Sequence, residues 1–225
     1  MRKPKHIHEA KLAKGQLPQT RPALLARIKE IKQAHAAAEV IRYGFSQTSV
    51  GTILVAESVN GTVAIAIREH PDEDALLSTV RARFPHAVLR HDRTGTRKAV
   101  EAVVGFVEGP RGNIPLPLDI RGTEFQRRVW AAVMKIPFAK TTNFAEIART
   151  VGSPRAVRAV GNACSQNPLE FAIPCHRVLR SDGSYSGGSA WGDRRQSTVL
   201  RREAQWLASM GAKLGPRRAA KGPRP

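Results

Sequence analysis

A run of glycine and proline residues near the middle of the chain limits the fold most, because it separates two stretches with different sequence patterns. The run starts at Gly109-Pro110-Arg111-Gly112, and Pro115 and Pro117 follow it. Such residues interrupt helices and strands and are typical of connecting segments. The chain has 225 residues, enough for two small domains. We therefore expect four segments: a basic arm at 1–37, a first domain at 38–115, a second domain at 116–210 and a basic disordered tail at 211–225.

The first domain is expected to combine strands with helices. Two apolar runs, 53–55 and 63–67, flank Asn60-Gly61, and an Asn-Gly pair in that position is a strong signal for a β-hairpin. Flanking prolines and glycines bound two expected helices, at about 72–83 and 97–107. Strands followed by helices on one face predict a small α/β domain. None of its residue clusters has a catalytic pattern.

The second domain is expected to be mostly helical, because three helix starts are signalled in a row. Thr123 and Asn143 are each followed three residues later by Gln or Glu, the spacing of a capping box. Ser153-Pro154 places a capping residue before a proline that suits the first helical position. The helix that starts here, 154–165, follows its predecessor after a Gly-Ser-Pro turn, and such a pair resembles a helix-turn-helix. We therefore expect DNA binding, with 154–165 as the recognition helix.

The charge of the chain points to the same partner. A formal net charge of +19 predicts affinity for polyanions, nucleic acid first. The expected recognition helix mixes arginines with small residues that would let a partner approach closely: Arg155, Ala156, Arg158, Ala159 and Gly161. A solvated arginine face on a packed helix is the alternative. In the arm, residues 21–38 have the apolar spacing of a helix, and the arm could bind DNA loosely or only aid solubility.

Several classes of protein are excluded at this level. No apolar run is long enough to span a membrane, and the early lysines precede no apolar stretch of signal-peptide type, so we expect a cytoplasmic protein. No amphipathic anchor with aromatic residues is present, so no membrane partner is expected. The two cysteines, Cys164 and Cys175, are too few for a disulfide framework or a four-thiolate zinc site. No metal is expected, and Cys164 is interpreted as a core residue.

The clearest chemical pattern is Ile173-Pro174-Cys175-His176-Arg177-Val178. It follows the apolar run Phe171-Ala172-Ile173, which we expect to be a strand. The thiolate is the reactive form of cysteine, and nearby His or Arg charge lowers the pKa of a thiol. A half-buried thiol beside an ordinary histidine is the alternative. Two glycines at 187–188 would allow a ligand to approach the backbone closely.

This combination resembles the O6-alkylguanine-DNA alkyltransferases, also called methylated-DNA–protein-cysteine methyltransferases, and most of all the C-terminal half of the bacterial Ada type. The likeness covers about residues 40–208. Its most specific parts are 155–161, 171–178, 184–188 with 191–192, and 200–203. The resemblance implies an α/β fold, in which a small N-terminal ribonuclease-H-like α/β domain precedes a mostly helical, winged-helix-like DNA-binding domain.

The resemblance also implies a reaction. O6-methylguanine would be flipped out of duplex DNA, and its methyl group would pass irreversibly to Cys175, once per protein molecule and without a cofactor. His176 would accept the thiol proton through a water, and Glu203 would orient and charge-balance the imidazole. Neighbouring side chains point apart on an extended chain, which favours a water bridge over a direct bond between Cys175 and His176. A surface salt bridge to Arg201 or Arg202 is the alternative for Glu203.

Further residues gain roles from the resemblance. Ser186 would donate to O6 of the flipped guanine, and the backbone carbonyls of Cys175 and Val178 would accept from its exocyclic amine. Asn167 would be a hinge between the recognition helix and the active-site strand, and Tyr185 would belong to the substrate pocket. Arg177 is expected to pair with an acid and hold the fold. Phe144 would line the pocket, although the family usually has a tyrosine there that donates to the guanine ring.

The implied DNA contacts lie in the minor groove. Arg158 would occupy the space that the flipped base leaves, and Arg155, Ala156, Ala159 and Gly161 would face the DNA. The expected partner is double-stranded DNA with O6-alkylguanine, bound by a monomer. The four-cysteine metal domain of full Ada proteins is missing from this sequence.

Three other functions stay open. They are an alkyltransferase-like lesion sensor that does not transfer the group, a helix-turn-helix transcription regulator, and a thiol hydrolase. The sensors lack the reactive cysteine, the regulator leaves 174–177 unexplained, and nothing in the sequence supplies an oxyanion site for the hydrolase.

Overall fold

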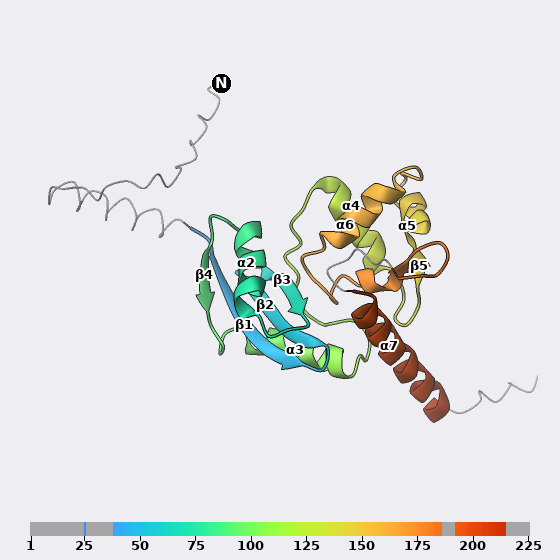
Figure 1. Cartoon of the computed structure of the whole chain (residues 1–225), viewed down its shortest axis with the longest axis horizontal. Helices are drawn as coiled ribbons and strands as arrows, with labels where there is room; N and C mark the ends of the chain where they lie inside the picture. Colours follow the sequence, from blue (N-terminus) through green and yellow to red (C-terminus); the bar gives the residue numbers. More distant parts are fainter. Residues whose placement is uncertain (1–24, 26–37, 186–191, 215–225) are drawn as a thin grey trace, which may run out of the picture. The chain divides into compact units, whose positions relative to one another are not determined.

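The computed structural model describes residue 25 and residues 38–185 and 192–214 (Figure 1). The predicted helix at 21–38, apart from residues 25 and 38, lies outside the described residues, as do the predicted site residue Ser186 and the glycines at 187–188. From Glu39 onward the described residues belong to one compact unit. The division near residue 115 stays a prediction. In the described part, no helix is long and apolar enough to cross a membrane.

The first half of this unit is built on a four-stranded sheet in the order β3-β2-β1-β4. The strands are β1 (Val40–Thr48), β2 (Gly51–Ser58), β3 (Gly61–Arg68) and β4 (Val88–His91). The first three are antiparallel, and β4 runs parallel to β1. The predicted Asn60-Gly61 hairpin is confirmed, since β2 pairs with β3 on either side of it. Strand β4 was not predicted, because it is four residues long and only its first two are apolar.

Gly61 is required by a close approach of the chain. Its φ is +137°, and a Cβ placed there would lie 2.6 Å from the carbonyl oxygen of Pro117. The same carbonyl accepts a 2.8 Å hydrogen bond from the backbone N–H of Thr62. The segment after the glycine–proline run is therefore attached to the free edge of β3.

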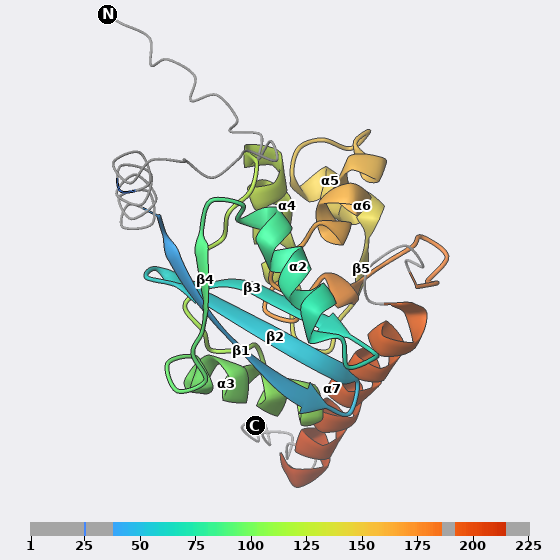
Figure 2. The ribbon, with the colours of Figure 1, turned by 60° about the vertical axis from the view of Figure 1, so that its left-hand side comes forward.

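The two helices of this half cover opposite faces of the sheet, so the expectation that both lie on one face was wrong (Figure 2). Helix α2 (Glu73–Arg83) packs with Leu54 of β2, whereas α3 (Arg97–Glu108) packs with Ile53 and Val55. Strand β2 is buried at five successive positions, 52–56. Four of these, 53–56, form a continuous apolar run, which is typical of a strand that is covered on both sides.

The second half is mostly helical, as expected. It contains α4 (Glu124–Met134), β5 (Thr142–Asn143), α5 (Phe144–Thr150), α6 (Val157–Ser165), the 3₁₀ turn η1 (Cys175–Arg177), β6 (Val178–Leu179) and α7 (Gly192–Leu214). The capping box at Thr123 is confirmed in both directions. Asn143 also caps its helix, since its side chain accepts a 2.9 Å bond from the N–H of Glu146. The short strands β5 and β6 pair in parallel, which places the start of α5 next to η1.

Helix α6 begins at Val157, three residues later than predicted. The N–H of Ala156 donates to the carbonyl of Ser153 at 2.9 Å, so residues 153–156 form a turn. Proline is favoured at the second position of such a turn, which explains why Pro154 does not start the helix. Arg155 therefore lies in the turn and Ala156 at the helix cap, not on the helix.

The expected strand at 171–173 was also wrong. Residues 171–173 form turns, and Phe171 has a φ of +68°. The chain is held to β3 just before this point, since Ile65 N–H donates to Pro168 and its carbonyl accepts from Glu170. Phe171 and Ile173 are buried in the main core. Their apolar character therefore reflects burial, which a short run does not distinguish from a strand.

Candidate active site

The cysteine and histidine lie on a 3₁₀ turn at the centre of the helical half. The N–H of Arg177 donates to Pro174 at 2.9 Å, and the N–H of Val178 closes the turn on the carbonyl of Cys175. The chain here is not extended, so the geometric reason given above for a water bridge does not apply. The water-mediated proton path stays a prediction.

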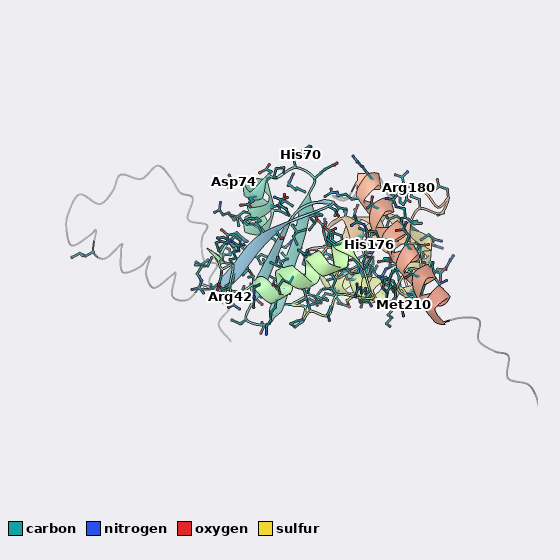
Figure 3. The ribbon with its side chains drawn as sticks, turned by 90° about the horizontal axis from the view of Figure 1, so that it is seen from below. Arg42, His70, Asp74, His176, Arg180 and Met210 are labelled. Atoms are coloured by element: carbon teal, nitrogen blue, oxygen red, sulfur yellow. The ribbon has the colours of Figure 1, made fainter. Side chains whose placement is uncertain are left out.

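His176 and Glu203 are brought together although they are far apart in sequence. Nε2 of His176 lies 2.9 Å from Oε1 of Glu203, and both side chains are fully buried. Glu203 comes from α7, and the ring of Phe106 on α3 lies 6.2 Å from the imidazole, centroid to centroid. Figure 3 shows His176 beside these two helices. The histidine is therefore enclosed between two helices.

Arg177 completes this cluster. Its guanidinium contacts both oxygens of Glu203, at 2.9–3.2 Å. It also donates to Asn113 and to the carbonyl of Ile136. The prediction that Arg177 pairs with an acid is confirmed. The alternative of a surface salt bridge between Glu203 and Arg202 is wrong. Arg202 is near Glu108 instead, with 3.9 Å between the charged atoms.

Burial sets the protonation of this cluster. It lowers the pKa of His176 below its ordinary value, and the hydrogen bond to Glu203 offsets only part of this effect. Burial pushes the pKa of Glu203 upward, but hydrogen bonds from His176 and Arg177 outweigh it, so the pKa lies below its usual value. The resting pair is a neutral imidazole and a carboxylate. Because a carboxylate only accepts, Nε2 of His176 carries the hydrogen and Nδ1 is the basic nitrogen.

The Cys175 thiol is protonated at rest. Its side-chain contact with Cys164, and then its burial, raise its pKa well above the ordinary value. A hydrogen bond with the Asn167 side chain acts in the opposite direction but does not prevail. A nucleophilic reaction at this sulfur therefore requires a base.

Sequence reasoning missed several groups that hold the site. The side chain of Gln196 donates to the carbonyl of His176 at 2.9 Å, and the N–H of Ala139 donates to Glu203 at 3.1 Å. Asn113, which contacts Arg177, lies at the end of the glycine–proline run. Gln196 has a detectable signal, because it lies on the same helix as Glu203, seven residues before it. A backbone donor such as Ala139 leaves no signal in the sequence.

The structure also places the predicted substrate residues. Asn167 donates from its side chain to Ile173 at 2.9 Å and from its backbone to Cys164, so it connects α6 with the turn that carries Cys175. Phe144 is the first residue of α5 and is partly buried against the main core. Val178 is buried, and Tyr185 is half-buried at the end of a described segment. The roles of these residues stay predictions.

The predicted DNA-contacting residues lie on one short stretch. Arg155 in the turn and Arg158 and Ala159 on α6 are exposed, and Ala156 and Gly161 are half-buried. A Cβ added at Gly161 would have no atom within 4 Å apart from the neighbouring backbone of its own helix. The opposite face of α6 packs as predicted, with Val160 and Cys164 buried. Trp130 of α4 fixes the helix by donating to the carbonyl of Ala163 at 2.9 Å. Among the described residues, no His, Cys, Asp and Glu side chains gather as metal ligands would.

Comparison with known proteins identifies the family. Residues 124–205 match the model of the 6-O-methylguanine DNA methyltransferase, DNA binding domain. The regulatory protein Ada of Salmonella typhimurium is 42% identical over 167 residues, which are 73% of this chain and 46% of that protein. The inducible methylated-DNA–protein-cysteine methyltransferase of Bacillus subtilis is 35% identical over 133 residues, 59% of this chain and 74% of that protein. The chain thus spans about half the length of its Ada relatives.

A solved structure shows the same architecture. The crystal structure of Mycobacterium tuberculosis OGT in complex with DNA matches with a TM-score of 0.61 and 28% sequence identity. The match covers 74% of this chain and 94% of that chain. It confirms the predicted fold class, a sheet-containing α/β part followed by a mostly helical part. By the identity and coverage of the Bacillus relative, together with the match of residues 124–205, this chain belongs to the methylated-DNA–protein-cysteine methyltransferase family.

Proposed function

We propose that this protein repairs DNA by transferring the methyl group of O6-methylguanine to Cys175, once per molecule. The observation that carries the proposal is the buried cluster of His176, Arg177 and Glu203 directly beside a protonated thiol. The family membership supports it, as does the DNA-bound state of the similar Mycobacterium protein. The α6 face and the net charge of +19 fit duplex DNA as the partner.

The chemistry follows from the resting protonation states. Nδ1 of His176 takes the proton of Cys175 through one water, and the carboxylate of Glu203 stabilises the imidazolium that forms. The sulfur then attacks the methyl carbon, a C–S bond forms, and the C–O6 bond breaks. The electron pair goes to the guanine, which takes up a proton as it leaves. The product is a thioether with no leaving group that water could displace under these conditions, so the protein is used up.

The site requires the base to leave the duplex, because a thiol on a buried turn does not reach O6 inside a base stack. Arg158 is exposed on α6, and Ala159 and Gly161 leave room around it. We propose that α6 enters the minor groove and that Arg158 fills the vacated position. Specificity for sequence is not needed, so phosphate contacts and groove shape dominate. The protein acts as a monomer, and with chromosomal DNA as substrate we expect it in the cytoplasm.

For the substrate pocket we propose the roles that the family resemblance implies. The carbonyls of Cys175 and Val178 and the hydroxyl of Ser186 contact the flipped guanine, and Tyr185 and Phe144 line the pocket. Phe144 has no hydroxyl to donate to the ring, so we expect slower transfer than in relatives with tyrosine. Phe144→Tyr should therefore raise the single-turnover rate without changing the stoichiometry.

The direct test uses a duplex oligonucleotide with radiolabelled O6-methylguanine. Label should move onto the protein up to one equivalent, and Cys175→Ser should abolish the transfer. An unmodified duplex of the same sequence is the control for binding. Tight lesion binding with no label on the protein would instead select the sensor function. Binding to one DNA sequence regardless of the lesion would select a transcription regulator.

A further inference from the structure

A second sulfur lies directly beside the proposed acceptor. The side chain of Cys164 of α6 interacts with that of Cys175, and each residue is 9% exposed. They are the two cysteines of the whole chain. Sequence reasoning gave Cys164 a packing role, but the methyl-transfer chemistry described above makes no use of its thiol.

One residue holds the two cysteines together. Asn167 donates from its backbone to the carbonyl of Cys164 at 3.2 Å and from its side chain to the carbonyl of Ile173 at 2.9 Å. Its side chain also interacts with the Cys175 side chain. The end of α6 and the turn that carries Cys175 are therefore fixed to each other, and the contact between the sulfurs is part of the packed core.

We propose that Cys164 and Cys175 form a reversible disulfide when the protein meets a peroxide, and that this bond protects the acceptor sulfur from irreversible oxidation. Formation of the bond does not depend on the proposed repair function. Its consequence, a temporary loss of repair, does rest on that function.

The reaction balances with hydrogen peroxide as the oxidant. A base takes the Cys175 thiol proton, the sulfur attacks one peroxide oxygen and the O–O bond breaks. The departing hydroxide takes up a proton, so a sulfenic acid and water form. The Cys164 sulfur then attacks the Cys175 sulfur, the S–S bond forms, the S–O bond breaks, and a second water leaves with the remaining thiol proton. The two thiols lose two electrons and the peroxide gains them. A small dithiol reverses the step by exchange.

The bond has a clear chemical consequence. The two interacting thiols would have to approach to the disulfide bond length of about 2.05 Å. Without a neighbouring thiol, a sulfenic acid oxidises further to a sulfinic acid, which a dithiol does not reduce. Cys164 would thus act as a resolving cysteine and preserve Cys175, which accepts a methyl group only once.

The test treats the reduced full-length protein with hydrogen peroxide, blocks free thiols with iodoacetamide and measures the intact mass. With two cysteines in the chain, the predicted product has lost two hydrogen masses, carries no carbamidomethyl group and is monomeric. Peptide mapping should show a Cys164–Cys175 link. Retention of two alkylatable thiols, or a disulfide between two protein molecules, would overturn the proposal.

A matched variant, Cys164→Ala, tests the protective role. Each protein is treated with peroxide and then with dithiothreitol, and its methyl transfer is expressed as a fraction of its own untreated value. This recovered fraction should be several-fold larger for the wild type than for the variant. The variant should carry a sulfinic acid at Cys175. Equal recovery and equal sulfinic acid content would contradict the protective role. If untreated wild type transfers no methyl group, the repair function fails, whereas the mass measurement still decides whether the disulfide forms.

Discussion

Two arginines of this protein show how differently one residue type is used in its helical half. Arg177 is fully buried and donates to a carboxylate, an amide oxygen and a backbone carbonyl, whereas Arg158 is exposed on α6. The charge of the buried arginine is balanced by the carboxylate, its other hydrogen bonds go to protein oxygens, and it cannot reach DNA. The exposed arginine is open to a partner, and we expect it to contribute little to the stability of the fold. The difference in burial alone therefore distinguishes a residue that holds the site together from one that we propose opens the duplex.

Replacing the buried arginine, Arg177, should have the largest effect on the free energy of unfolding. Arg177→Ala leaves Glu203 buried with one compensating partner fewer, and breaking a buried pair in this way costs about 3–5 kcal/mol. Urea unfolding should show this loss in the free energy of unfolding. Arg158→Ala is the matched control and should change the same quantity by no more than about 0.5 kcal/mol. Similar losses for both variants would mean that the cluster around Glu203 does not hold the fold.

Glu170 is a buried carboxyl group whose charge is only partly balanced by neighbouring groups. Its side chain is buried, Oε2 has no hydrogen-bond partner, and burial raises its pKa to about 8 despite the charges of Arg195 and Arg68 and a hydrogen bond from Ile67. The folded protein therefore keeps a proton that the unfolded chain releases near pH 4.5. Stability from this group is present at low pH and is lost as the pH rises from about 5 to 8, by an amount on the order of a few kcal/mol.

Glu170→Gln should remove this pH dependence. The free energy of unfolding should be measured in urea at pH 5.5 and pH 8.5 for both proteins. The decrease between the two pH values should be smaller in the variant by a few kcal/mol, on the scale of about 1.4 kcal/mol per pKa unit. Equal decreases in both proteins would show that Glu170 is already ionised in the fold at pH 5.5.

Arg158→Ala should affect function where it does not affect stability. Loss of the residue that fills the vacated base position should slow methyl transfer from duplex DNA by about tenfold, equivalent to about 1.4 kcal/mol. Reaction with free O6-benzylguanine should change much less. Arg97→Ala on α3 removes the same charge from an exposed site and is the control. A comparable loss on both substrates would contradict the proposed role.

Gly161 offers the smallest and most specific change. A Cβ there meets nothing beyond the neighbouring backbone of its own helix, so Gly161→Ala should raise the free energy of unfolding by about 0.5–1 kcal/mol, because glycine is unfavourable inside a helix. The same methyl group would face the DNA and should weaken duplex binding, measured by fluorescence anisotropy. A variant that is both more stable and equally tight on DNA would remove this part of α6 from the proposed interface.

Local signals in the sequence predicted the elements around the site well. Thr123 and Asn143 cap the helices that they were expected to start, and Asn60-Gly61 marks the hairpin. Each of these depends on residues a few positions apart. The start of α6 was missed because Ser153-Pro154 suits a turn as well as a helix. Strand β4 was missed because its stability comes from pairing with β1, which the four residues themselves do not encode.

The residue types of the site could be predicted from the sequence, but the contacts between those residues could not. The motif around Cys175 and the acid at Glu203 could be matched to a family, and the structure places His176 and Glu203 in contact. The double use of Glu203 by His176 and Arg177, and the contact of Cys164 with Cys175, depend on how α6, α7 and the turn pack. Such contacts join residues that are distant in sequence, so spacing does not reveal them.

The central claim is that Cys175 takes one methyl group and no other residue does. The most direct measurement is the intact mass and peptide map of the protein after incubation with excess duplex DNA containing O6-methylguanine. The account predicts a gain of one methyl group at Cys175, no methyl group at the adjacent Cys164, and no further turnover. Methylation at Cys164, or release of more than one equivalent of repaired guanine per protein molecule, would contradict it.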